Sequence, residues 1–220
     1  SGEMVAVVGP VGCGKTTLAR ALGRMVEVPR GQLFLDGHDL TCLRLDDLRE
    51  QIALVPQEGY LFTSSLADNL RYGEPEAGLN RVEAAAQQAR LLADVRGFPD
   101  GMNTLVGERG ITLSGGQRQR TALGRALLLK APVLVLDDAL ASVDNNTAAE
   151  ILASVRRQTQ RTIVMISHQL SAAAACDRIL VLDRGRLVQQ GHHTDLIREQ
   201  GLYRSLWERE QAAERLESVA

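Results

Sequence analysis

Gly9-Pro10-Val11-Gly12-Cys13-Gly14-Lys15-Thr16-Thr17 is the stretch that decides the fold. Its pattern of Gly, four residues and Gly-Lys-Ser/Thr is typical of a loop that binds phosphate groups. An apolar run at 4–8 predicts a strand before it, and the run 18–22 predicts a helix after it. Glycines let backbone N–H groups point toward a phosphate, and a helix start adds unpaired N–H donors. We therefore expect a nucleoside triphosphate here, rather than a glycine-rich turn without a ligand.

Two side chains of this loop have separate expected tasks. Lys15 can reach the outer phosphates, and the hydroxyl of Thr16 can bind Mg²⁺, with Thr17 next to it. Cys13 lies at a helix N-terminus, where a thiol can become reactive toward thiol reagents. The alternative for Cys13 is a small buried residue without a chemical role.

Composition limits the class of protein. The chain has 220 residues, a formal net charge of −2 and 3% aromatic residues. This length allows one compact domain, or one domain with an inserted lobe. The near-neutral charge and scarce aromatic side chains argue against a nucleic-acid partner. Three cysteines without metal-ligand spacing fit a reducing compartment, and no apolar run is long enough to span a bilayer.

Strand-like and helix-like runs alternate along most of the chain. They predict an α/β fold that resembles the RecA-like core of P-loop NTPases, with a mostly parallel sheet and an inserted α-helical subdomain. We assign the core to 1–57 and 126–220, and the helical subdomain to 58–125. Predicted strands lie at 4–8, 32–35, 51–55, 133–136, 162–166, 179–182 and 187–188. Predicted helices lie at 18–22, 46–50, 84–92, 114–129, 147–158 and in the tail from 194.

An acidic pair ends one of these strands. Asp137 and Asp138 follow the buried run 133–136. A carboxylate at the end of such a strand can hold Mg²⁺ beside a phosphate loop, so Asp137 is a candidate metal ligand. The alternative is an ordinary turn or helix cap at the end of the strand.

A further motif identifies the family. Leu113-Ser114-Gly115-Gly116-Gln117 resembles the signature motif of ABC-type ATPases. As a plain reading, Ser114 caps the helix that follows, but a cap does not explain two glycines followed by Gln117. The backbone N–H groups of Gly115 and Gly116 can approach a γ-phosphate at a helix start.

Four more segments match this family in the expected order. Gln57 resembles the glutamine that senses Mg²⁺ and couples to a transport domain. The segment 104–110 resembles the one that precedes the signature in exporters, and 141–144, ending in Asp144, resembles the D-loop. His168 ends a predicted strand and resembles the switch histidine that contacts the γ-phosphate. A lone histidine at a strand end is more often structural, and only this constellation favours function.

The resemblance implies the nucleotide-binding domain of an ABC exporter, with ATP and Mg²⁺ as cofactors. In this family the signature of one domain closes the phosphate loop of a second, so two nucleotides lie in a head-to-tail dimer. A membrane domain on the same polypeptide, at the cytoplasmic face of the inner membrane, is also implied. The chain starts just before its phosphate loop at Ser1, which suggests a piece of a longer protein. The family's adenine-stacking aromatic would precede Ser1, so we expect weak ATP binding.

One departure from the family concerns catalysis. The family usually has Glu after the Mg²⁺ aspartate, as the base that polarises water, whereas this chain has Asp138. Asp is shorter by one C–C bond, about 1.5 Å, and a general base depends on reach before pKa. We therefore expect this chain to form a heterodimer in which its own site hydrolyses ATP slowly, while its intact signature serves the partner's site. A homodimer, or Asp138 acting through a shifted water, is the alternative.

Two further functions stay open at this stage. One is a regulatory module that binds ATP without useful turnover. The other is a soluble ABC ATPase that acts on nucleic acid, which the net charge and the exporter-like segment 104–110 disfavour. The sequence does not identify a transported substrate.

Overall fold

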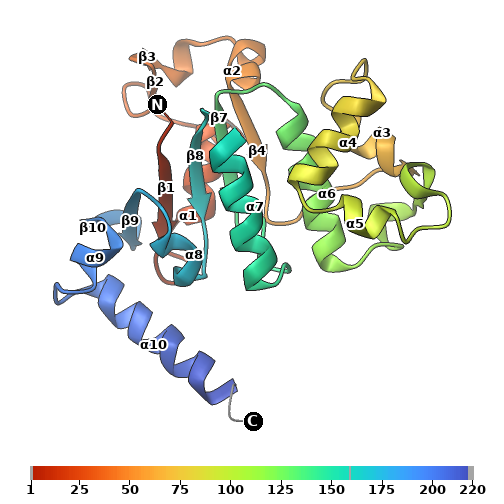
Figure 1. The fold of residues 1–220 in the computed structure, drawn as a ribbon. Coiled ribbons are helices and arrows are strands. Elements are labelled where there is room, and N and C mark those ends of the chain that lie inside the picture. The colour runs from red at the N-terminus through yellow and green to blue at the C-terminus, as the bar shows by residue number, and fades with distance from the viewer. Residues whose placement is uncertain (1, 159, 218–220) are drawn as a thin grey trace.

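A computed structural model describes residues 2–158 and 160–217. Its centre is a six-stranded sheet with the order β10-β9-β1-β8-β7-β4, whose strands lie side by side across Figure 1. All neighbouring strands are parallel except β9 and β10, which form an antiparallel hairpin. The strands are β1 (Met4–Val8), β4 (Ile52–Val55), β7 (Val133–Asp137), β8 (Thr162–Ile166), β9 (Arg178–Asp183) and β10 (Arg186–Gly191).

Helices cover both faces of this sheet. The first face packs against α1 (Lys15–Leu22) and α2 (Leu45–Gln51). The opposite face packs against α7 (Asn145–Gln158) and α8 (Leu170–Ala174), drawn in front of the sheet in Figure 1. Side chains alternate between the two faces, as the period of a strand requires. In β7, for example, Val135 faces the α1 side while its two leucine neighbours face the other. This arrangement confirms the predicted α/β fold with a mostly parallel sheet.

The strand register places three loops at one edge of the sheet. Val7 of β1 lies opposite Ile166 of β8, and Asp137 of β7 lies opposite the same Ile166. The segments after β1, β7 and β8 therefore leave the sheet side by side. Ligands of parallel α/β sheets bind at this carboxyl edge.

A group of helices lies beyond β4 at one side of the sheet (Figure 1). It has its own hydrophobic cluster, built from residues between Leu61 and Leu128. The long helix α6 joins it to the rest, because Leu123 and Leu127 belong to the main core while Leu128 belongs to this cluster. The division at 57/58 and 125/126 stays a prediction. The members are α3 (Leu66–Arg71), α4 (Leu79–Gln88), α5 (Leu92–Val95), α6 (Gly115–Leu128), β5 (Ser64–Ser65) and β6 (Leu105–Val106).

The helix predicted at 84–92 has different bounds. Helix α4 begins five residues earlier and ends at Gln88, because Arg90 adopts the left-handed conformation with φ 55°. The Leu91 N–H then donates to the Ala86 carbonyl, which closes the helix end. The short pair β5 and β6 is also absent from the predicted set. Local sequence gives no signal for it, since each strand has two residues.

The remaining elements are short, apart from the last helix. His193 opens α9 and its Nδ1 contacts the Tyr203 hydroxyl at 2.8 Å, so it has a structural contact. Among the residues that the structure describes, no helix is long and apolar enough to cross a bilayer. The remaining elements of the fold are β2 (Phe34–Leu35), β3 (His38–Asp39), α9 (His193–Leu196), α10 (Leu202–Glu217) and single 3-10 turns at Leu40–Cys42, Gly101–Asn103 and Glu108–Gly110.

Candidate nucleotide-binding site

The loop between β1 and α1 depends on backbone conformations that favour glycine. Gly9 has φ 149° and Gly14 has φ 105°. A Cβ atom on Gly9 would lie 2.1 Å from the Leu182 carbonyl oxygen of β9 and 2.8 Å from the Cys13 Sγ. The loop is also tied to the β9–β10 hairpin, because the Gly185 N–H donates to the Cys13 carbonyl over 2.9 Å. The phosphate-loop motif is thus a packed turn at the carboxyl edge of the sheet.

Lys15 begins α1 and folds back over this loop. Its ammonium group donates to the carbonyl oxygens of Gly9 and Pro10, over 2.8 and 3.0 Å. The side chain is 95% buried, since only 5% of its surface is exposed. A buried ammonium group inside a ring of backbone groups attracts an anion strongly. Cys13 is also buried in the loop, which favours the reading of a small packed residue over that of a reactive thiol.

Thr16 and Asp137 connect the loop to the end of β7. The Thr16 hydroxyl donates to the Asp137 carboxylate over 3.1 Å. Asp137 is 3% exposed, and burial raises the pKa of its carboxyl, with a smaller rise from the Asp138 charge. A buried, poorly solvated carboxylate gains most from a cation, so this position suits a metal ligand.

The oxygen atoms of this pair fit Mg²⁺. Magnesium prefers oxygen ligands and is held by one or two carboxylates together with phosphates and waters. In 2–158 and 160–217, no group of three or more His, Cys, Asp and Glu side chains could hold a metal ion without other ligands. A site of Thr16 and Asp137 therefore needs oxygen atoms from a phosphate to complete it.

Asp138 turns away from the strand that precedes it. Its φ is 50°, in the left-handed region, and its N–H donates to the Ile166 carbonyl over 2.9 Å. The residue lines a small cavity together with Ser167 and Gln169, which flank His168 in the chain. Backbone pairing with β8 thus holds Asp138 beside the segment that carries His168.

His168 faces the phosphate loop. It is exposed and lines a cavity of about 400 Å³ together with Gly9, Pro10 and Val11. The structure thus brings His168 to the loop, although 151 positions separate Thr17 and His168 in the chain. The arrangement follows from the parallel pairing of β1 and β8.

The signature segment starts α6 with a complete capping box. The Gln117 N–H donates to the Ser114 hydroxyl over 3.2 Å, and the Ser114 N–H donates to the Gln117 Oε1 over 2.9 Å. The amide nitrogen of Gln117 is held in turn by Asp94 of α5 over 3.0 Å. These contacts leave the two glycines between them, Gly115 and Gly116, at the open end of the helix.

Asp144 lies beside this signature segment in the same chain. It caps α7 by accepting the Thr147 N–H over 2.9 Å, which lowers the pKa of its carboxyl. The two segments line one cavity of about 390 Å³. The neighbouring Ser142 donates its N–H to the Gln119 Oε1 over 2.7 Å, which joins the turn before α7 to α6.

Gln57 follows β4 and lies on the signature side. It is exposed and lines a cavity of about 700 Å³ with Gly115, Arg109 and Ala141 among others. The candidate residues therefore form two groups around different cavities. One group contains the phosphate loop and His168, and the other contains Gln57, the signature segment and Asp144.

Several residues that hold this site were not predicted. Gln119, Asp94 and Gly185 act through contacts with residues far away in sequence. Gln119 has one local signal, since it is a polar residue on the apolar side of an amphipathic helix and is 9% exposed. Gly185 lies in a polar run, and Asp94 is a single acid among apolar residues, so neither has a pattern that marks it.

Comparisons with known proteins agree with this geometry. A family model described as "ABC transporter" matches residues 1–141. The chain is 42% identical, over 99% of its length, to an "ATM1-type heavy metal exporter" of Novosphingobium aromaticivorans. It is 45% identical, over 93% of its length, to an "ATP-dependent lipid A-core flippase" of Alkalilimnicola ehrlichii. It spans 36% and 35% of the lengths of these two relatives.

A solved structure shows the same fold. The chain superimposes on a bacterial Atm1-family ABC exporter with ATP bound, with a TM-score of 0.92 and 41% identity. This match covers 96% of the chain and 37% of that protein. The predicted resemblance and the P-loop NTPase fold are confirmed, and the chain belongs to the ABC transporter family, as an exporter-type nucleotide-binding domain.

Proposed function

We propose that this chain binds ATP with Mg²⁺ and hydrolyses it to drive transport across a membrane. The observation that carries the proposal is the contact between Thr16 and Asp137 beside the buried Lys15. Two oxygen-bearing side chains that could bind Mg²⁺ thus lie next to a loop that could bind phosphate. By their printed names the relatives are a heavy metal exporter and an ATP-dependent flippase, which supports the same class of activity here.

Each residue of the first group has one task in this proposal. Backbone N–H groups of Gly12 and Gly14 face the phosphates, and Lys15 exchanges its carbonyl partners for phosphate oxygens. Thr16 and Asp137 would hold Mg²⁺, whereas Gln57, the third ligand that the family resemblance implies, lines the cavity of the signature segment. When bound, Mg²⁺ neutralises charge that develops on the transferred phosphoryl group.

The attacking water needs residues of its own. Asp138 accepts its proton or orients it, and the ring of His168 donates to an oxygen of the γ-phosphate. Both residues leave the same edge of the sheet through the pairing with β8. General-base catalysis by a side chain contributes about 10²–10⁴-fold, so the reach of Asp138 determines much of the rate.

We further propose that this chain has the slower site of a heterodimer. Asp138 is held by its backbone N–H and by its left-handed φ, so its short side chain cannot gain reach by moving the backbone freely. The signature segment, in contrast, has a complete capping box. Such a chain completes its partner's site better than it uses its own.

Asp138→Glu tests this asymmetry. In the assembled transporter we expect turnover to rise by up to about 2-fold, because the longer carboxylate can at most make this chain's site as fast as the partner's, while the ATP affinity stays unchanged. Asp138→Asn is the matched control, because it keeps the size and removes the base. An unaltered turnover in Asp138→Glu would count against the degenerate site. If the unsubstituted transporter and both variants bind ATP but show no turnover, the regulatory module is favoured.

The proposed partners include a membrane domain on the same polypeptide, at the cytoplasmic face of the membrane. The chain spans about a third of its relatives, which are named as exporters and flippases. Tyr60 lines the same cavity as Gln57 and contacts Phe62, whose ring centroid lies 4.3 Å from that of Tyr72 in a stacked pair. Cross-linking at Tyr72→Cys against a membrane-domain cysteine tests this surface. Capture only by other soluble domains would contradict it.

A further inference from the structure

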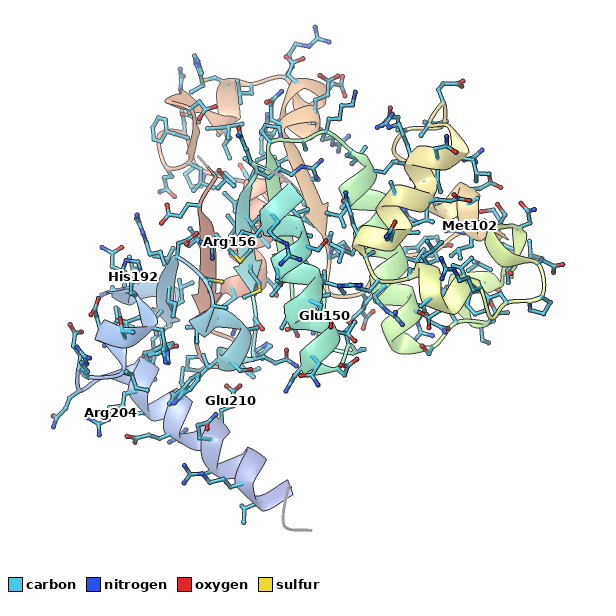
Figure 2. All side chains as sticks on the ribbon, in the orientation of Figure 1. Met102, Glu150, Arg156, His192, Arg204 and Glu210 are labelled. Atoms are coloured by element: carbon cyan, nitrogen blue, oxygen red, sulfur yellow. The ribbon has the colours of Figure 1, made fainter. Side chains whose placement is uncertain are left out.

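The C-terminal helix α10 contacts the segment that carries His168. The carboxylate of Glu210 accepts the Leu170 N–H over 2.8 Å at Oε2 and 3.0 Å at Oε1. The same Oε1 accepts the Ser171 N–H over 3.4 Å. Figure 1 shows α10 running past α8, and Figure 2 shows the Glu210 side chain on the α8 side of its helix.

The position of this carboxylate in the chain is notable because it is remote from the motifs. Glu210 lies 40 residues after Leu170 and belongs to a different helix. It nevertheless lines the same cavity as His168, Gly9 and Val11. Leu206, one turn earlier on α10, lines this cavity too and packs against the main core. The helix is therefore docked at this point.

The segment 167–171 is fixed on both sides of His168. On the side of β8, the Ser167 N–H donates to the Val7 carbonyl over 3.3 Å, and the Ser167 hydroxyl accepts the Gln169 N–H over 3.0 Å. On the other side, the two N–H groups of Leu170 and Ser171 depend on Glu210. These N–H groups start α8, so no carbonyl of the same helix is available to them.

We propose that Glu210 is a positioning residue for His168. Its carboxylate holds the start of α8 and thereby sets the position of the imidazole ring at the phosphate loop. Through this contact, helix α10 couples the C-terminal region to ATP turnover. The inference rests on the proposed function for its effect on turnover, while the contact itself does not.

Three substitutions test the hydrogen bonds that the Glu210 carboxylate accepts. Glu210→Ala removes both acceptor oxygens. Glu210→Gln keeps Oε1, which already accepts from both Leu170 and Ser171, so it should restore the contact. Glu208→Ala is the matched control, because Glu208 lies on the same helix but pairs with Arg204 across the helix surface.

The first measurement is amide hydrogen exchange of the segment 167–171 in the assembled transporter. In Glu210→Ala we expect Leu170 and Ser171 to exchange about 10-fold faster. In Glu210→Gln and Glu208→Ala we expect exchange within about 2-fold of the unsubstituted protein. Unchanged exchange in Glu210→Ala would overturn the contact, whether or not the protein hydrolyses ATP.

The second measurement separates positioning from a purely structural role. Measured at this chain's own site, in a transporter whose partner site is disabled, Glu210→Ala should lower kcat for ATP by about 10-fold, because small displacements of catalytic groups are costly, with KM changed less than about 2-fold. In a His168→Ala background the same substitution should change kcat by less than about 2-fold. If the losses of kcat from Glu210→Ala and His168→Ala multiply in the double variant, the proposal is overturned. An inactive unsubstituted transporter would refute the proposed function instead, and hydrogen exchange would still decide the contact.

Discussion

The hydroxyl of Thr16 donates a hydrogen bond to the carboxylate of Asp137 over 3.1 Å, which joins the first helix to the end of a central strand. The two residues lie 121 positions apart in the sequence. Their contact places a buried acid beside a loop of backbone N–H groups and a buried ammonium group. These three features are the basis of the proposal that the site binds a phosphate together with Mg²⁺.

Asp137→Asn should stabilise the chain without nucleotide and abolish the magnesium dependence of ATP binding. Burial raises the folded-state pKa of Asp137 above the ordinary 3.8, so the folded state binds its proton more tightly than the unfolded state. This group therefore lowers stability as pH rises from about the ordinary value through the raised one. Asn still accepts from Thr16 but has no charge to desolvate, and a gain of about 1 kcal/mol at neutral pH is expected.

Thermal unfolding of both proteins between acid and neutral pH checks this, with calorimetric ATP titrations in the presence and absence of Mg²⁺. The difference in Tm should vanish at low pH, where Asp137 is protonated. A variant that is less stable at neutral pH, or that still needs Mg²⁺ for tight binding, would contradict the assignment of Asp137.

Lys15→Ala should weaken ATP binding by about 10–100-fold, the value of a hydrogen bond to a charged group. The ammonium group is the cation of the cradle, and its present partners are the carbonyls of Gly9 and Pro10. Lys130→Ala is the matched control, because Lys130 is the other lysine of the chain and is exposed. Equal ATP affinities in the two variants, measured by equilibrium titration, would exclude Lys15 as a phosphate ligand.

Gly9→Ala should destabilise the fold by about 3 kcal/mol or more, as overpacking against backbone does. The new Cβ would lie 2.1 Å from the Leu182 carbonyl oxygen. Gly12→Ala is the comparison: its φ is 81° but no atom lies within 4 Å of the added Cβ. Its cost should be about 1 kcal/mol, from backbone strain alone. Denaturant unfolding measures both, and a smaller loss in Gly9→Ala would show that the β9 contact is not tight.

Thiol reagents should modify Cys42 first and spare Cys13. Cys42 is exposed, whereas Cys13 is 4% exposed and packs inside the loop. In a Cys42→Ser variant, we expect thiol reagents to label Cys13 slowly and to leave ATP binding unchanged. Peptide mass spectrometry after timed labelling gives the rates. Fast labelling of Cys13 that ATP suppresses would restore the alternative of a reactive thiol in the loop.

The phosphate loop and the acidic strand end could be predicted because each has a local signal. The loop at Gly9 has a fixed spacing, and Asp137 follows a continuous apolar run, which is the pattern of a buried parallel strand. The order of strands in the sheet then brought both to one edge, as expected. His168 was predicted only through family resemblance, since a strand-end histidine alone has little meaning.

The supporting contacts could not be predicted, because they depend on tertiary structure. Gly185 reaches the loop through a hairpin, and Glu210 reaches Leu170 from a different helix. Arg90 ends α4 with a left-handed φ where the local sequence favours a continuing helix. Neither periodicity nor spacing distinguishes these three positions from ordinary solvated residues.

In the proposed heterodimer, this chain's signature serves an active partner site, while its own phosphate loop serves a slower one. The most direct test compares Gly115→Asp with Lys15→Ala, each in this chain alone, by steady-state ATP turnover of the assembled transporter. An Asp in the first turn suits a helix start but repels a phosphate. We expect ATP turnover to fall by about 100-fold in Gly115→Asp and by less than about 10-fold in Lys15→Ala. Equal losses, or a larger loss for Lys15→Ala, would contradict it.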